Sequence, residues 1–233
     1  MKDNNTNGKV YGIGVGSGNP EDLTLKAVRI LNECDGILVP AVPPEQSMAY
    51  QIALSTNPLW KEKPVYGFPF PMTKDAKIRD DAMKNVYNEI KGYLDEGQQL
   101  AFLTIGDVSI YSTFFYLKPY LDAGGYATEI VSGIPSFVAA AAVLGQSLCL
   151  DQEELHVVNS NSDYETALQL PGTKVFMKSG KSLADLKQVL MQHREYPMFA
   201  VKDCGMPTEE VFFTPEDIPV TYMVLVIVKA VES

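Results

Sequence analysis

The chain of 233 residues has few of the residues that mark nucleic-acid-binding and metal-binding proteins. Only 3 arginines are present, and the formal net charge is −10. Because nucleic-acid binders usually neutralise phosphates with clustered lysines and arginines, we expect no nucleic acid as a partner. The two histidines, His156 and His193, are far apart, and no cysteine or histidine pair has the spacing of a metal site. We therefore expect no bound metal ion.

Cysteines and long apolar runs are also scarce. Cys34, Cys149 and Cys204 are widely separated, and an odd number of such cysteines is typical of reduced thiols in the cytoplasm. No run approaches the roughly 18 apolar residues that a membrane span needs, and residues 1–8 lack the apolar segment of a signal peptide. Hydrophobic residues make up 46% of the chain and charged residues 21%, which is an ordinary globular balance. We expect a cytoplasmic protein that does not bind membranes.

Apolar runs and stretches of helical periodicity alternate along the chain. Strands are predicted at residues 10–15, 35–39, 65–68, 99–104, 128–131, 155–158, 174–177, 199–202 and 221–228. Helices are predicted at residues 22–34, 47–54, 75–95, 110–121, 136–144, 164–168 and 183–193. This alternation is typical of layered α/β folds. Because Gly124-Gly125 interrupts it, we predict two successive α/β domains, residues 9–122 and 126–233. The strand near the C-terminus, apolar over residues 222–228, is expected at the centre of its sheet.

Two glycine-containing stretches match nucleotide-binding loops only in part. Four glycines alternate within residues 12–18, but the third glycine of the fingerprint G-x-G-x-x-G falls on Ser17 or Asn19. Residues 179–182, Ser-Gly-Lys-Ser, match the end of a P-loop, but Val175 stands where that motif has its first glycine. A dinucleotide site and a full ATPase site are therefore disfavoured. The second stretch could still bind an anion through its backbone amides.

The best candidate binding loop follows the predicted strand at residues 99–104. It begins with Gly106-Asp107, and three short hydroxyl side chains come after it, Ser109, Ser112 and Thr113. Ligands of α/β sheets bind beyond the carboxyl ends of strands, and a glycine permits a ligand to approach the backbone closely. Asp107 is also suited to cap the helix that follows, so both roles are open at this point.

Three stretches resemble, in order and spacing, the motifs of the tetrapyrrole (corrin/porphyrin) methylases. They are residues 10–27, Gly106-Asp107 with Tyr111-Ser112-Thr113, and residues 131–141, within a resemblance that covers residues 9–230. The resemblance implies a class III methyltransferase of two α/β domains, usually a homodimer, which holds S-adenosylmethionine in the cleft between its domains and releases S-adenosylhomocysteine. The chain departs from the family pattern at Ser17 and Val108, where proline with its fixed φ is usual.

Further stretches resemble one branch of this family, the precorrin-2 C-20 methyltransferases. They are residues 38–41, 47–52, 68–72 and 101–107. The resemblance implies methylation of precorrin-2 or of cobalt-factor II (cobalt-precorrin-2) in cobalamin biosynthesis, and it does not separate the metal-free from the cobalt-containing substrate. The alternatives are a methylase of the same fold that acts on another corrin carbon, on ribosomal RNA or on diphthine, and a non-catalytic α/β ligand-binding protein.

The resemblance also implies which residues form the site. Cofactor-binding residues would be Ile105, Gly106, Asp107, Ile110, Ser112, Thr113, Pro135, Ser136, Met177 and Thr221. Substrate-binding residues would be Gly14, Ser17, Tyr111, Lys178, Lys181 and Lys202. The lysines follow predicted strands and suit the many carboxylates of a tetrapyrrole, although solvated surface lysines would look the same. We predict no catalytic side chain, because a sulfonium donor has a good leaving group and orientation alone can supply much of the rate.

Overall fold

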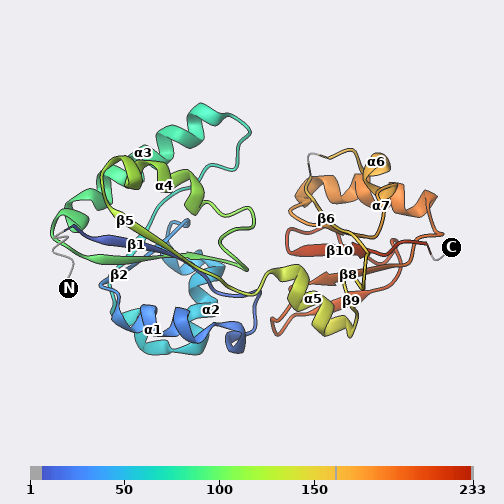
Figure 1. The fold of residues 1–233 in the computed structure, drawn as a ribbon, viewed down its shortest axis with the longest axis horizontal. Coiled ribbons are helices and arrows are strands. Elements are labelled where there is room, and N and C mark those ends of the chain that lie inside the picture. Colours follow the sequence, from blue (N-terminus) through green and yellow to red (C-terminus); the bar gives the residue numbers. More distant parts are fainter. Residues whose placement is uncertain (1–6, 161, 232–233) are drawn as a thin grey trace. The chain divides into compact units, whose positions relative to one another are not determined.

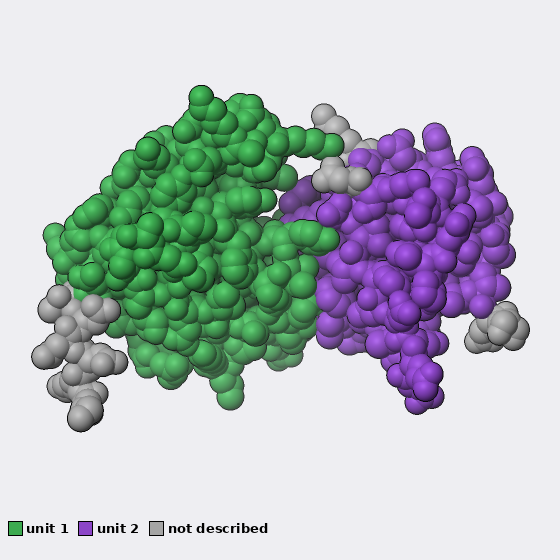
Figure 2. Space-filling view, turned by 45° about the horizontal axis from the view of Figure 1, so that its top comes forward, with its two compact units in different colours: residues 1–135 green, residues 136–233 purple. Residues whose placement is uncertain are grey.

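A computed structural model describes residues 7–160 and 162–231. The chain forms two compact units, residues 1–135 and 136–233 (Figure 2). Each unit contains one five-stranded sheet with helices on both faces (Figure 1). The predicted α/β class is therefore confirmed. In the described ranges, no helix combines the length and the apolar character that are needed to cross a bilayer.

Unit 1 is built on a parallel sheet with the strand order β3-β2-β4-β1-β5. Its strands are β1 (Lys9–Gly14), β2 (Gly36–Val39), β3 (Val65–Gly67), β4 (Gln99–Thr104) and β5 (Ala127–Val131). Its helices are α1 (Leu25–Glu33), α2 (Met48–Thr56), α3 (Ala76–Asp95) and α4 (Phe114–Ala123), with short 3-10 helices η1 (Pro20–Asp22), η2 (Pro44–Gln46) and η3 (Pro58–Glu62). Helices α1 and α2 cover one face of the sheet, and α3 and α4 cover the other (Figure 1).

The main core of unit 1 lies between the sheet and helices α3 and α4. The buried side chains of α3 recur every three or four residues and so share one helical face: Met83, Val86, Ile90 and Leu94. They belong to one apolar cluster with Leu38 and Phe102 of the sheet. The ring of Phe114, the first residue of α4, meets that of Phe102 edge to face, with 5.6 Å between the centroids. This packing fixes the start of α4 against β4, and therefore fixes both ends of the loop between them.

Helix α1 is held at both ends by side-chain hydrogen bonds. The Thr24 hydroxyl caps its N-terminus by accepting from the Ala27 N–H at 3.2 Å. At its C-terminus, the Lys63 ammonium donates to the carbonyl oxygens of Asn32 (3.0 Å) and Cys34 (2.6 Å), which suits the negative end of the helix dipole. The glycine-rich connection from β1 to α1 is thus fixed at its far end.

Unit 2 is built on a mixed sheet with the strand order β6-β7-β10-β8-β9, in which only β6 and β7 pair in parallel. Its strands are β6 (Leu155–Val158), β7 (Thr173–Phe176), β8 (Met198–Lys202), β9 (Glu210–Phe212) and β10 (Val224–Val228). Its helices are α5 (Ser136–Leu144), α6 (Tyr164–Leu168), η4 (Gly180–Ser182) and α7 (Leu183–Gln192). Helices α6 and α7 lie on one face and α5 on the other (Figure 1). The wholly buried β10 is central, as predicted.

Unit 1 extends further than the sequence predicts. Residues 127–131 were expected in the second domain, but β5 pairs with β1 along its whole length, from Lys9 opposite Ala127 to Ile13 opposite Val131. Gly124-Gly125 only ends α4, where the Gly124 N–H donates to the Tyr120 carbonyl, and turns the chain into β5. The two units therefore divide after Pro135.

The helix predicted at residues 110–121 begins later, at Phe114. The residues before it form a turn, in which the Ile110 N–H donates to the Asp107 carbonyl at 3.2 Å. Tyr111 then has a φ of 51°, which no residue of a right-handed helix adopts. The short edge strand β9, of one exposed and two half-buried residues, was not predicted at all.

Candidate active site

The three motif loops of unit 1 meet at one edge of its sheet. They follow β1, β4 and β5, which are neighbours in the order β4-β1-β5 and run in parallel. Because the carboxyl ends of parallel strands lie at the same edge, residues 15–18, 105–111 and 132–135 come together. The first and third loops are far apart in the sequence, so only the fold brings them together.

The first and second loops are joined through two glycines. The Gly106 N–H donates to the Gly16 carbonyl at 2.6 Å, and the Gly16 N–H donates back to the Gly106 carbonyl at 3.3 Å. Both glycines have positive φ, 76° at Gly16 and 73° at Gly106. Residues other than glycine adopt this backbone conformation only at a cost in free energy. The Val15 N–H adds a third bond, to the Thr104 carbonyl at 2.9 Å. Gly16 of the alternating glycines therefore takes part in a backbone junction between the two loops. This role does not require the dinucleotide-binding fingerprint, which the sequence matches only in part.

The third loop packs against the same junction without any intervening side chain. A Cβ added to Gly14 would lie 2.5 Å from the Gly106 carbonyl oxygen and 2.7 Å from the Gly133 nitrogen. A Cβ added to Gly133 would lie 2.2 Å from the same Gly106 oxygen. These separations are far below van der Waals contact, so both Gly14 and Gly133 require glycine as the loops stand.

The carboxylate of Asp107 links the second loop to the third. Its Oδ1 accepts from the Ser109 N–H at 2.7 Å and from the Ser109 hydroxyl. Its Oδ2 accepts from the Gly133 N–H at 2.9 Å, and the residue is only 7% exposed. The capping alternative for α4 is wrong, since that helix begins at Phe114 with Thr113 as its N-cap.

The end of the second loop is fixed by buried hydroxyls. The hydroxyls of Thr104 and Ser112 lie 2.9 Å apart, and the Ser112 oxygen also accepts from the Phe114 N–H at 3.2 Å. Between them the chain carries Tyr111, a strained residue that is 47% exposed. Strain of this kind in a non-glycine residue is common at functional sites.

At Ser17 and Val108, where the family pattern has proline, burial takes the place of the rigidity that proline would give. Val108 is fully buried in the apolar cluster between the sheet and α4. Ser17 is 2% exposed and forms a hydrogen bond with Asp22. Burial raises the pKa of Asp22, and the Ser17 hydrogen bond partly lowers that pKa again. Packing at both positions therefore restrains the loops that proline would otherwise stiffen.

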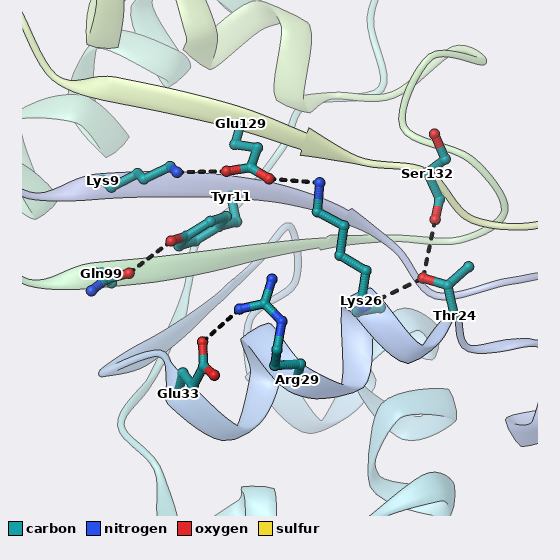
Figure 3. Close-up of polar contacts among 10 residues, drawn as sticks. Lys9, Tyr11, Thr24, Lys26, Arg29, Glu33, Gln99, Glu129 and Ser132 are labelled. Carbon is teal, nitrogen blue, oxygen red and sulfur yellow. Dashed lines mark hydrogen bonds and ion pairs between the residues drawn. The ribbon is translucent and has the colours of Figure 1, made fainter.

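A polar network on the other face of the sheet ties α1 to β5 (Figure 3). The Glu129 carboxylate bonds to the ammonium groups of Lys26 (2.7 Å) and Lys9 (2.5 Å), and the Thr24 hydroxyl donates to the Ser132 carbonyl at 3.4 Å. The bonds from Lys26 and Lys9 lower the pKa of Glu129 to about 2. Sequence reasoning missed this network. The only signal was a single charged residue in each strand, Lys9 in β1 and Glu129 in β5.

Unit 2 brings its own predicted site residues to one edge of its sheet. Met177 and Lys178 follow β7, Lys202 ends β8, and Thr221 lies three residues before β10. Because β10 runs antiparallel to both neighbours, its start lies beside these strand ends, and the Asp203 N–H bonds to the Met223 carbonyl at 2.9 Å. The side chain of Lys181 lies outside the described residues.

The two described lysines of this edge differ in their surroundings. Lys178 is exposed, has a φ of 57°, and its Nζ lies 6.0 Å from the centroid of the Tyr222 ring. Lys202 is bound to Glu210 at 2.6 Å with Asp203 at 3.8 Å, and the Glu210 hydrogen bond is the main cause of its raised pKa. Met177 is buried, with its N–H bonded to the Val158 carbonyl at 3.0 Å. Among the described residues, no cluster of three or more His, Cys, Asp or Glu side chains could hold a metal ion.

Comparison with known proteins gives a consistent result. A family model described as Tetrapyrrole (Corrin/Porphyrin) Methylases matches residues 9–218. The chain is 34% identical over 204 residues to a "Probable cobalt-precorrin-2 C(20)-methyltransferase" of Methanocaldococcus jannaschii, covering 87% of this chain and 86% of the relative. It is 28% identical over 189 residues to the cobalt-precorrin-2 C(20)-methyltransferase of Salmonella typhimurium, covering 80% and 79%.

Solved structures share the fold. Uroporphyrin-III-C-methyltransferase from Thermus thermophilus matches with a TM-score of 0.71 and 24% identity, over 96% of this chain and 95% of that one. A structure of the Thermus thermophilus uroporphyrin-III C-methyl transferase in complex with S-adenyl homocysteine matches with a TM-score of 0.70 and 18% identity, over 96% and 98%. At these identities the likeness establishes the fold alone.

Proposed function

Because the chain belongs to the tetrapyrrole (corrin/porphyrin) methylases, we propose that it transfers the methyl group of S-adenosylmethionine to C-20 of cobalt-precorrin-2 in cobalamin biosynthesis. The observation that carries the proposal is the junction of three motif loops, bonded to one another at the carboxyl ends of β4, β1 and β5. The cobalt-containing substrate is favoured over metal-free precorrin-2 because both relatives described above are named for it.

The residues around the loop junction fit an adenosyl ligand. Ile105, Ile110 and Pro135 offer half-buried apolar surface beside this junction. We assign cofactor binding to these residues together with Gly106, Ser112, Thr113, Ser136, Met177 and Thr221. When bound, S-adenosylmethionine supplies a methyl group on a positively charged sulfur. An electron-rich ring carbon can attack this methyl group in line, and S-adenosylhomocysteine is the leaving group. The chain then needs to bind and orient the two reactants, and positioning of this kind contributes much of the rate in such reactions.

The substrate would be held by a few exposed groups. Tyr111 offers an exposed aromatic ring, and Lys178 offers an exposed cation for a carboxylate. Lys202 has to leave Glu210 before it can bind a substrate carboxylate, and Lys181 is assigned from the family motif alone. Gly14 and Ser17 are buried, so their part is to shape the loop beside the substrate.

Two further features follow from family membership and belong to the proposal. We infer a homodimer in the cytoplasm, acting on a small tetrapyrrole without nucleic acid as a partner. Light scattering of the purified protein would test the dimer, since a monomeric mass at micromolar concentration would contradict it.

The function is tested by following a labelled methyl group. The purified protein is incubated with S-adenosylmethionine that carries an isotopic label on its methyl group, and with cobalt-factor II or with precorrin-2. The expected result is S-adenosylhomocysteine and one labelled methyl at C-20 of the cobalt-containing ring, located by NMR. A label at another ring carbon would assign the protein to a different branch of the family. Release of no S-adenosylhomocysteine with either tetrapyrrole would overturn the proposal.

A further inference from the structure

The side chain of Asp107 is placed to hold two loops together. We propose that Asp107 is a positioning residue: its carboxylate sets the Gly106 loop and the Gly133 loop in the arrangement that binds the cofactor, and it does not contact the cofactor itself. This inference rests on the proposed function, because it concerns the same cofactor site. It replaces the direct contact that the family resemblance implied for this residue.

The acceptors of the Asp107 carboxylate are largely occupied within the protein. Three donors reach it, the N–H and the hydroxyl of Ser109 on one oxygen and the Gly133 N–H on the other. A carboxylate offers about four lone-pair sites. Only 7% of the residue is exposed, so little of it can face a ligand.

The bond to Gly133 is the directional link between loops that otherwise meet through glycine backbone. Gly133 packs against the Gly106 carbonyl and Gly14 with no side chain between them. Glycine backbone is conformationally free, and van der Waals contact alone does not fix its direction. The Gly133 N–H is fixed by the Asp107 oxygen at 2.9 Å, and the chain continues from there through Ile134 and Pro135 of the third motif. Asp107 therefore determines where that motif lies in unit 1.

A carboxylate is required because donors reach both of its oxygens. In Asp107→Asn the side chain keeps one acceptor oxygen, and its NH2 group must face an N–H donor at either Ser109 or Gly133. In Ser109→Ala both backbone bonds to Asp107 remain and only the hydroxyl is lost. We expect Asp107→Asn to weaken the binding of S-adenosylhomocysteine about 10-fold or more, and Ser109→Ala to weaken it no more than about 3-fold.

Ligand analogues separate positioning from direct contact. Binding of S-adenosylhomocysteine and of its 2′-deoxy and 3′-deoxy analogues is measured by isothermal titration for the wild type and for Asp107→Asn. Positioning predicts the same fold-loss for all three ligands, since the loops are displaced for each. A direct bond from Asp107 to a ribose hydroxyl predicts that the loss disappears with the analogue that lacks that hydroxyl, and this would overturn the proposal.

A destabilised control separates positioning from general loss of stability. Ile90→Ala removes a buried side chain of α3 that is not part of the loops. It is expected to lower the melting temperature at least as much as Asp107→Asn while leaving the affinity for S-adenosylhomocysteine unchanged. If equal loss of melting temperature brings equal loss of affinity, Asp107 has only a structural role.

The failures of the two proposals are distinguishable. A wild type that does not bind S-adenosylhomocysteine refutes the proposed function. A wild type that binds it, with Asp107→Asn binding equally well, refutes the positioning role alone. If Asp107→Asn is insoluble, Asp107→Glu tests the same point, because it keeps both acceptors on a longer side chain and should bind between the wild type and Asp107→Ala. Insolubility of all three variants would show a requirement for folding and would also contradict the proposal.

Discussion

A Cβ on Gly133 would lie 2.2 Å from the carbonyl oxygen of Gly106, so the second and third loops pack backbone against backbone. This contact leaves no room for the smallest side chain. Because the Gly106 oxygen also accepts the Gly16 N–H, it cannot move aside without loosening the first loop as well. The three loops therefore behave as one packed unit.

The first prediction follows from this contact. Gly133→Ala is expected to destabilise the protein by about 2 kcal/mol through overpacking and to weaken S-adenosylhomocysteine binding strongly, as measured by urea unfolding and by titration. Gly92→Ala is the matched control, because Gly92 lies within α3 and a Cβ there has nothing within 4 Å. That variant should be neutral or slightly stabilising. Equal behaviour of the two variants would contradict the close approach.

The second prediction concerns Glu129, which bonds to both Lys9 and Lys26. These bonds hold its pKa near 2 in the folded protein, below the usual value of 4.5. A carboxyl group with a lowered folded pKa stabilises the protein fully above pH 4.5, and that stabilisation is lost as the pH falls toward 2. Glu129→Gln should therefore cost about 1 kcal/mol at neutral pH, after allowance for partial solvent screening.

The measurement for Glu129 is urea unfolding of the wild type and the variant between neutral and acid pH. The difference between them should shrink below pH 4.5. Glu33→Gln is the control, since Glu33 pairs with Arg29 on an exposed turn of α1 and should contribute almost nothing. A difference for Glu129→Gln that stays constant with pH would mean that the ion pairs do not stabilise the fold.

The strands were predictable because they depend on local pattern. Buried parallel strands such as β4 are continuous apolar runs, and β10 was recognised as central for the same reason. The domain boundary was not predictable from a local pattern. Gly124-Gly125 is the same signal whether it ends a domain or turns α4 into β5, and only the pairing of β5 with β1 decides between them.

The sequence identifies the loops of the candidate site but not the contacts between them. The motifs located the Gly106 and Gly133 loops, but the bond from Gly133 to Asp107 spans 26 positions of the chain. It depends on the neighbouring order of β4, β1 and β5, which no spacing in the sequence encodes. The late start of α4 has a similar origin, because the bonds of Ser112 to Thr104 and Phe114 compete with helix formation at that point.

The third prediction concerns pH near neutrality. His193, at the end of α7, bonds to Glu195 at 3.2 Å and to Glu165 of α6 at 2.7 Å. The bonds to Glu195 and Glu165 raise the pKa of His193 above its usual 6.5. A histidine with a raised folded pKa stabilises the protein fully below pH 6.5, and the effect is lost as the pH rises through the folded pKa.

The expected result for His193 is a pH-dependent melting temperature. His193→Gln should melt at a lower temperature than the wild type at about pH 6, and the two should converge at about pH 9. Arg194→Gln is the neighbouring control, because it breaks the ion pair between Arg194 and Glu216. Neither of these two groups titrates between about pH 6 and pH 9. A difference for His193→Gln that grows with pH would reverse the sign and refute the assignment.

The fourth prediction compares the two described lysines at the strand ends of unit 2. Lys178 is exposed, whereas the charge of Lys202 is already balanced by Glu210 at 2.6 Å. If the proposed substrate carboxylates are recognised here, Lys178→Gln should raise KM for the tetrapyrrole about 5-fold, the amount that an exposed ion pair of about 1 kcal/mol supplies. Lys202→Gln should change KM less, because it removes an internal pair together with any contact to substrate.

The comparison of Lys178 and Lys202 is made by steady-state kinetics at two ionic strengths. The effect of Lys178→Gln should diminish at high salt, since exposed charges are screened, while KM for S-adenosylmethionine stays unchanged. Lys84→Gln, on the exposed side of α3, controls for the overall change in net charge. A larger effect of Lys202→Gln would mean that the pair with Glu210 opens when substrate binds, and that Lys202, not Lys178, recognises the carboxylates.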